Sequence, residues 1–246
     1  MHKTTRALVL REVKYKEADK ILTVLTEDEG KQTVCARGVL RKGSKAAAAC
    51  QLLTFSEMTL FERGGKWYVS EGSAIEQFLG LRQDIAALSL GTYFAELLEA
   101  VSDEDSHDVQ IMSLGLNALF ALSKELYSPE HIKAVFELKL MCLAGYEPSL
   151  DYCPVCGEET PKAPVFSTLE GTVICSSCAA AYGETFPLCE ASLAAMRHIT
   201  RSEPKRAFAF SLESDAERRL AQVCESYVIS QLERRFSALD YWRSVK

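Results

Sequence analysis

The period of the hydrophobic pattern changes near residue 80, and this change constrains the fold more than any other feature of the sequence. Before it, apolar residues alternate with polar ones, as in residues 31–37 and 55–61. After it, apolar residues recur every three or four positions, as in residues 85–101. Because alternation is typical of half-buried strands and the longer period of amphipathic helices, the sequence predicts a β part followed by an α part.

The β part contains five candidate strands, at residues 5–13, 20–26, 31–37, 54–61 and 67–75. Glycines in residues 27–30 and 63–65 indicate hairpin turns. Residues 40–53 form one long connection, whose alanines are compatible with a short helix. Five strands with one long connection are typical of a Greek-key barrel such as an OB-fold, although other small barrels fit the pattern nearly as well.

The α part begins with helices predicted at residues 85–101 and 109–124, separated by an acidic break at 103–108 that we interpret as a loop. Ser128, as an N-cap before Pro129, begins a third helix. Near the C-terminus an amphipathic stripe runs at steps of four residues: Leu220, Cys224, Val228, Leu232 and Phe236. We therefore predict an α+β fold with an N-terminal OB-fold β-barrel in residues 1–79 and an all-α helical domain in residues 80–246.

The charge changes at the same place as the period. The chain has a net charge of −6, which alone argues against a nucleic-acid partner. Residues 1–80, however, hold 13 Lys or Arg and 10 Asp or Glu, a net charge of +3, whereas residues 81–246 hold 15 and 24, a net charge of −9. Such asymmetry favours a polyanionic partner for the β part, although a solvated loop explains a small basic cluster equally well.

Four of the nine cysteines form two C-x2-C pairs, Cys153 with Cys156 and Cys175 with Cys178, separated by 18 residues. This spacing predicts one tetrahedral metal site, most simply a structural Zn²⁺, because four thiolates leave no open position for substrate. A rubredoxin-like iron fits the same ligands, and a redox C-x-x-C is a weaker interpretation. The other cysteines are interpreted as small core residues.

No motif for catalysis is found in the sequence. The four histidines are far apart, and the chain contains no H-E-x-x-H, G-x-S-x-G, G-x-G-x-x-G or P-loop. The chain also has no apolar run approaching the roughly 18 residues of a membrane span, and the four apolar residues at 7–10 are too few for a secretory signal. We expect a cytosolic binding protein that is neither an enzyme nor attached to a membrane.

Two stretches of the chain resemble the RecO family of bacterial recombination mediators. The first joins ALVL at residues 7–10, YKEADKIL at 15–22, TEDEGK at 26–31 and RGVLRKGSK at 37–45. The second joins FELKL at 136–140, GYEP at 145–148 and DYCPVCG at 151–157. The order and spacing of these pieces carry the resemblance, which covers essentially the whole chain.

The resemblance implies an OB-fold, a helical domain and a zinc-ribbon insert at about residues 150–180. It further implies binding to single- and double-stranded DNA, annealing of complementary strands, and loading of recombinase onto single strands coated by the single-stranded-DNA-binding protein (SSB). The implied partners are RecR and the acidic C-terminal tail of SSB, in the bacterial cytoplasm at the nucleoid.

On this chain, we expect phosphates to follow the cations of the barrel face and its loop: Lys14, Lys16, Lys31, Arg37, Arg41, Lys42 and Lys45. Candidates for base stacking are Tyr15, Trp67, Tyr68 and Phe78, although core packing explains most such residues. For the SSB tail, we expect an apolar groove on the third helix with Lys139 at its edge and Lys133 beside it. Snorkelling or pairing with a buried acid explains Lys139 as well.

Two other classes of function remain open at this point. A nuclease or other nucleic-acid-processing enzyme with a structural zinc ribbon requires clustered carboxylates around Mg²⁺ or a cofactor loop, and neither is recognisable in the sequence. A protein-interaction adaptor without a DNA role requires no basic surface at all.

Overall fold

The computed structural model describes residues 2–104 and 108–246. Part of the acidic break predicted at 103–108 therefore lies outside the described residues. The chain forms two compact units, Met1–Lys124 with Phe236–Lys246 and Glu125–Arg235. The first unit thus combines the β part with helices, and the domain boundary near residue 80 stays a prediction.

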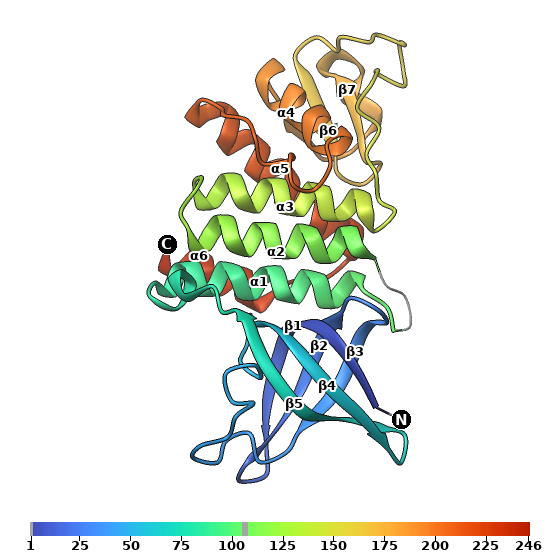
Figure 1. Cartoon of the computed structure of the whole chain (residues 1–246). Coiled ribbons are helices and arrows are strands. Elements are labelled where there is room, and N and C mark those ends of the chain that lie inside the picture. Colours follow the sequence, from blue (N-terminus) through green and yellow to red (C-terminus); the bar gives the residue numbers. More distant parts are fainter. Residues whose placement is uncertain (1, 105–107) are drawn as a thin grey trace. The chain divides into compact units, whose positions relative to one another are not determined.

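A closed five-stranded barrel forms the N-terminal part of the first unit (Figure 1). Its strands are β1 (His2–Tyr15), β2 (Asp19–Thr26), β3 (Gly30–Ala36), β4 (Phe55–Arg63) and β5 (Lys66–Glu76). They pair in the order β1-β2-β3-β5-β4, and β4 returns to β1. The interior is filled by the alternating apolar residues, including Val34, Met58 and Leu60. The predicted α+β fold with an OB-like barrel is confirmed.

The long connection after β3 contains turns but no helix. Its alanines serve close packing instead, because a Cβ added to Gly72 of β5 would lie 2.9 Å from the Cβ of Ala49. The connection starts with a left-handed Gly38, whose N–H donates to Asp19 Oδ1 at 2.7 Å. The Leu40 N–H donates to the carbonyl of Ala18 at 2.9 Å. The start of the loop is therefore tied to the turn between β1 and β2.

Three helices complete the first unit: α1 (Ile85–Val101), α2 (Val109–Ser123) and α6 (Ser237–Val245), after a short 3-10 turn, η1 (Leu79–Arg82). Asp84 and Asp108 accept hydrogen bonds from the first N–H groups of α1 and α2. Helix α1 is joined to the barrel at Glu99, which pairs with Arg11 at 3.0 Å. The Lys31 ammonium donates to the carbonyl of the same Glu99 at 2.8 Å.

The second unit contains three helices and a small antiparallel sheet: α3 (Pro129–Leu143), β6 (Pro164–Ser167), β7 (Thr172–Cys175), η2 (Ser176–Ala181), β8 (Thr185–Pro187), α4 (Glu190–Arg201) and α5 (Ser214–Leu232). Ser128 caps α3 as predicted, since its hydroxyl accepts from the His131 N–H at 3.0 Å. The sheet order is β7-β6-β8.

The C-terminal stripe does not form one continuous helix, which corrects the sequence interpretation. Helix α5 ends at Leu232, Glu233 adopts a left-handed conformation with φ of 49°, and Phe236 is the N-cap of α6. Phe236 continues the apolar spacing beyond the end of α5, but it is apolar for another reason. It packs within the first unit against Tyr93, with 5.5 Å between the ring centroids. Among the described residues, no helix is long and apolar enough to cross a membrane.

Candidate metal centre and nucleic-acid interface

Four cysteine thiols gather beside the small sheet of the second unit. The Sγ atoms of Cys153, Cys156, Cys175 and Cys178 all lie within 4.8 Å of one another. Two thiolates bound to one tetrahedral ion at about 2.3 Å lie about 3.8 Å apart, and the Sγ atoms of Cys156 and Cys175 are separated by 3.8 Å. The two C-x2-C pairs come together as their spacing predicts, and these residues fit a four-thiolate metal site.

The local backbone forms a knuckle around the first pair. The Gly157 N–H donates to the Cys153 carbonyl at 2.8 Å, and the Cys153 N–H donates to the Glu158 carbonyl at 2.9 Å. Gly157 adopts a φ of 74°, a conformation in which glycine is favoured. The second pair is brought near because β6 and β7 form a hairpin in which Cys175 lies opposite Pro164.

The thiol environment favours ionisation of one ligand. Burial raises the pKa of Cys153, but backbone N–H groups, first among them that of Cys175, outweigh it and lower this pKa to about 6. The Cys175 N–H lies 3.5 Å from the Cys153 Sγ. Because the thiolate is the form that binds a metal, these donors prepare Cys153 for coordination.

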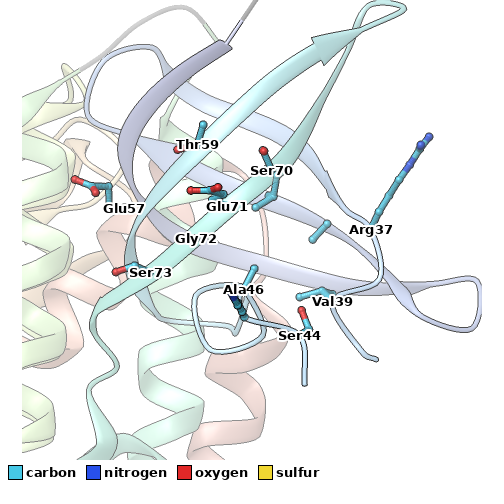
Figure 2. Close-up of a pocket in the computed structure, with 13 residues that line it drawn as sticks. Arg37, Val39, Ser44, Ala46, Glu57, Thr59, Ser70, Glu71, Gly72 and Ser73 are labelled. Atoms are coloured by element: carbon cyan, nitrogen blue, oxygen red, sulfur yellow. The ribbon is translucent and has the colours of Figure 1, made fainter. Parts of the chain in front are cut away.

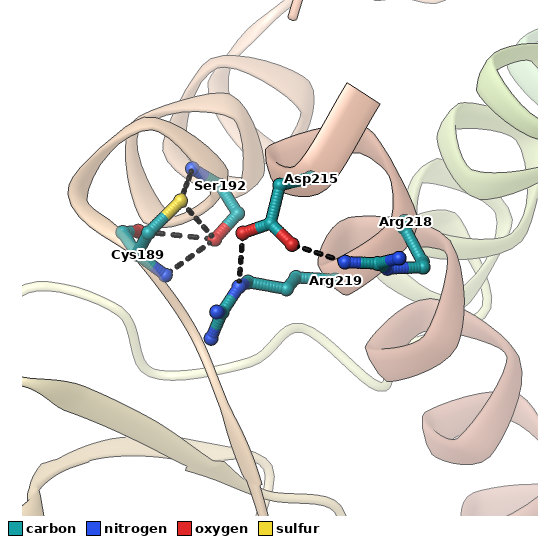
Figure 3. A network of polar contacts seen from close by, with 5 residues as sticks. All are labelled: Cys189, Ser192, Asp215, Arg218 and Arg219. Carbon is teal, nitrogen blue, oxygen red and sulfur yellow. Dashed lines mark hydrogen bonds and ion pairs between the residues drawn. The ribbon is translucent and has the colours of Figure 1, made fainter. Parts of the chain in front are cut away.

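Cys189 lies outside this cluster and caps a helix (Figure 3). Its Sγ accepts a hydrogen bond from the Ser192 N–H at 3.5 Å, and its own N–H donates to Ser192 Oγ at 2.8 Å. Burial raises the pKa of the Cys189 thiol, but the hydrogen bonds from Ser192 lower it below its ordinary value. Nearby, Asp215 of α5 pairs with Arg218 and Arg219 (Figure 3). This network is explained by the ends of α4 and α5 and requires no ligand.

The barrel carries a basic hollow at the tied start of its long loop. Its charged lining comprises five cations and one acid: Lys16, Lys20, Arg37, Arg41, Lys66 and Asp19. Tyr15 and Tyr68 line the same hollow. The structure thus brings Lys16, Arg37 and Arg41 of the predicted set together. The hollow presents mainly positive charge because five cations face one carboxylate, and Asp19 also accepts a hydrogen bond from the Gly38 N–H.

The hollow also contains Lys20 and Lys66, which are not among the DNA contacts predicted from the sequence. Lys66 begins β5 and reaches the hollow only because β5 pairs with β3, a contact between segments far apart in the chain. The sequence feature that could have indicated Lys66 is its place directly after the turn at residues 63–65. The ammonium of Lys20 contacts Glu12 at 2.7 Å and the Cys50 carbonyl at 3.3 Å, which gives it a structural role as well.

The remaining predicted cations lie elsewhere on the barrel or have internal partners. Lys14 and Lys42 are exposed, and Lys45 lines a neighbouring hollow that contains Glu57 and Glu71. In that hollow Arg37 lies at the margin and points away from the two carboxylates (Figure 2). The Lys31 ammonium, by contrast, donates a hydrogen bond to the backbone carbonyl of Glu99. Because carboxylates repel phosphates, the basic hollow is the better candidate for a phosphate backbone.

Of the aromatic candidates, Tyr15 is half exposed, whereas Phe78 is buried and Trp67 packs against the barrel core. Tyr68 is only 9% exposed, but its ring faces outward and lies under the guanidinium of Arg37, with 4.3 Å between Cζ and the ring centroid.

The two lysines predicted to bind a peptide are buried in the second unit. Lys133 is 2% exposed and pairs with Glu137 at 3.0 Å and Glu225 at 2.8 Å. Lys139 is 6% exposed, and its ammonium donates to the Thr200 carbonyl at 2.9 Å. A peptide carboxylate would therefore compete with existing partners, and binding of the SSB tail at these residues stays a prediction.

Two family models match nearly the whole chain. Residues 1–78 match the model of the Recombination protein O N terminal family, and residues 82–240 match that of the Recombination protein O C terminal family. The chain belongs to the RecO family. The sequence resemblance is thereby confirmed.

Relatives of this RecO-family chain are similar over most or nearly all of its length. A protein named DNA repair protein RecO from Acetivibrio thermocellus is 31% identical over 98% of this chain and 96% of its own. One from Symbiobacterium thermophilum is 28% identical over 95% and 94%. One from Listeria monocytogenes is 34% identical over 70% and 66%. Membership of the RecO family supports a role in DNA repair.

Proposed function

We propose that this chain is a non-catalytic mediator of recombinational DNA repair. It binds DNA, anneals complementary single strands, and helps to load recombinase onto single-stranded DNA coated by SSB. The basic hollow of the barrel carries this proposal, because a cluster of cations with few acids attracts the phosphates of DNA whatever its base sequence. Family membership supports it.

The DNA contacts are proposed at the exposed cations of the barrel and its loop, now with Lys66: Lys14, Lys16, Arg37, Arg41, Lys42 and Lys45. Lys31 is proposed as a secondary contact, because its ammonium already donates to Glu99. We propose RecR and the acidic SSB tail as protein partners, the tail near Lys133 and Lys139. The site of action is the bacterial cytoplasm, at the nucleoid.

We propose Zn²⁺ as the metal of the four-cysteine site. The four thiolates would hold it and complete its coordination, so the ion supplies cross-linking of the small sheet and no reaction chemistry. The cysteine ligands lie in the knuckle and at the end of the β6–β7 hairpin.

The test is to mix the purified chain with labelled single strands, without nucleotide, and to measure binding by fluorescence anisotropy and annealing by the loss of a quenched signal. We expect salt-sensitive binding and faster annealing of complementary strands. Binding without annealing would contradict the mediator activity. Shortened strands on a denaturing gel in the presence of Mg²⁺ would favour the nuclease, and no binding at low salt would favour the adaptor.

A further inference from the structure

A ladder of stacked planar groups crosses the outer face of the barrel from strand to strand. The ring of His2 lies 5.7 Å from that of Phe61, and Phe61 lies 5.3 Å from Tyr68, with interplanar angles of 30° and 21°. The guanidinium of Arg37 lies over Tyr68 at 4.3 Å. We define these four residues as the stacked ladder.

The strand register places the ladder on the outside of the barrel. His2 pairs with Phe61 across β1 and β4, and Phe61 pairs with Tyr68 across β4 and β5. The neighbours of Tyr68 along β5, Trp67 and Val69, pack against the barrel core. Because side chains alternate along a strand, Tyr68 points to the outer face.

Arg37 is the exposed end of the ladder on the side of the basic hollow. Tyr68 beneath it is nearly covered, whereas Arg37 itself is exposed. The Arg37 side chain is therefore supported on one face by an aromatic ring and open on the other. A phosphate contact needs only charge, and a lysine would provide it without an aromatic support. A planar guanidinium held on a ring is instead suited to stacking against another flat group.

We propose that Arg37, carried on Tyr68, stacks on a nucleobase of single-stranded DNA while the cations around it contact phosphates. This inference rests on the proposed function and adds a base contact to it. Single strands expose the faces of their bases, whereas paired strands bury these faces in the duplex. Stacking is tolerant of sequence because every base has a π face. Arg37 therefore gives the chain a preference for single strands without a preference for sequence.

The test compares Arg37→Lys with Arg206→Lys in the full chain. Both variants keep the charge and lose the plane, and both positions are exposed. Arg206 lies in the second unit, outside the proposed DNA contacts, so it serves as the control. We expect Arg37→Lys to bind a deoxythymidine oligonucleotide about tenfold more weakly. Its loss of affinity for duplex should be much smaller, because the charge is kept. Arg206→Lys should change the affinity by less than about twofold.

An abasic strand of the same length separates stacking from backbone contact. Wild type and Arg37→Lys should bind this strand equally, because it has phosphates but no bases. Equal binding of the two proteins to the normal oligonucleotide would overturn the inference, as would an equal loss on single strands and duplex. If the wild type itself fails to bind any single strand, the proposed function fails first. Melting temperatures of the variants check that the fold is retained.

Discussion

At the scale of the residue, the ammonium of Lys133 is the centre of a buried charge cluster. Burial alone lowers the pKa of Lys133, but the charges of Glu137 and Glu225 and their hydrogen bonds hold it above its ordinary value. Lys133→Ala leaves Glu137, which is fully buried, without this partner. We expect the free energy of unfolding to fall by about 3–5 kcal/mol. Denaturant titration followed by circular dichroism measures this loss.

A double variant tests whether the loss comes from the charge that is left behind. Lys133→Met with Glu137→Leu removes both buried charges, while Glu225 is 21% exposed at its side chain and can reach water. We expect the double variant to be markedly more stable than Lys133→Ala, because an apolar pair of similar volume can replace a buried ion pair. Equal stability of the two variants would show that packing, not charge, is decisive at Lys133.

The imidazole of His131 makes the stability of the second unit depend on pH. Burial lowers the pKa of His131 from its ordinary value of 6.5, although the Phe208 carbonyl and Glu217 oppose this shift. The unfolded chain therefore binds the proton more readily. The stability due to neutral His131 is present above about pH 6.5 and is lost as the pH falls below it. We expect His131→Gln to flatten the decrease of melting temperature between neutral and mildly acidic pH.

At the scale of the element, the three-stranded sheet β7-β6-β8 is too small to be stable without support. Its strands contain three or four residues each, and its core consists largely of Cys153, Ile174 and Cys175. Small sheets of this kind require a metal or further packing. We expect one Zn²⁺ per chain by atomic emission, and we expect Cys175→Ser to lose this zinc and to increase hydrogen exchange in residues 150–187.

Cys189→Ser is the matched control for the metal site. Cys189 caps α4 and lies outside the four-thiol cluster, so its zinc content should equal that of the wild type. Exchange rates in residues 150–187 that are the same with and without metal would contradict a structural role for the ion. Loss of zinc in Cys189→Ser would show that the four-thiol assignment is incomplete.

How well each element was predicted depends on how local its signal is. Ser128 and Pro129 identify the start of α3, and the C-x2-C spacing identifies the metal ligands, because both signals lie within a short segment. The break between α5 and α6 was not predicted, because Phe236 lies four residues after Leu232 and so continues the apolar spacing of α5 across the break. Lys66 was missed because β5 meets β3 only when the barrel closes, and no local pattern encodes that contact.

At the scale of the whole molecule, the change in charge at residue 80 was recognisable from composition, but the binding surface was not. The acidic total of −6 conceals a β part of +3. The structure divides the basic residues of this part further, since Lys31 is bonded to Glu99 and Lys45 lines a hollow with Glu57 and Glu71. A count of charges cannot separate such residues, because their partners come from other strands and from α1.

The charges of the loop should therefore determine the salt dependence of DNA binding. Arg41 and Lys42 are adjacent and exposed, and Arg41 lines the basic hollow. We expect Arg41→Glu with Lys42→Glu to weaken single-strand binding and to flatten the plot of log affinity against log salt by about 0.7 for each phosphate that is no longer neutralised. Fluorescence anisotropy over a series of salt concentrations measures both effects.

The adjacent exposed pair Lys205 and Arg206 in the second unit provides a control with the same change in net charge. If DNA responded only to the total charge of the chain, reversing either pair would weaken binding equally. If the barrel binds the phosphates, reversal at Lys205 and Arg206 leaves the salt slope unchanged, because the slope counts the counterions released at the bound phosphates and not the overall field. An equal decrease of slope in both variants would show that phosphates are also bound in the second unit, and would therefore reject the barrel as the sole DNA-binding surface.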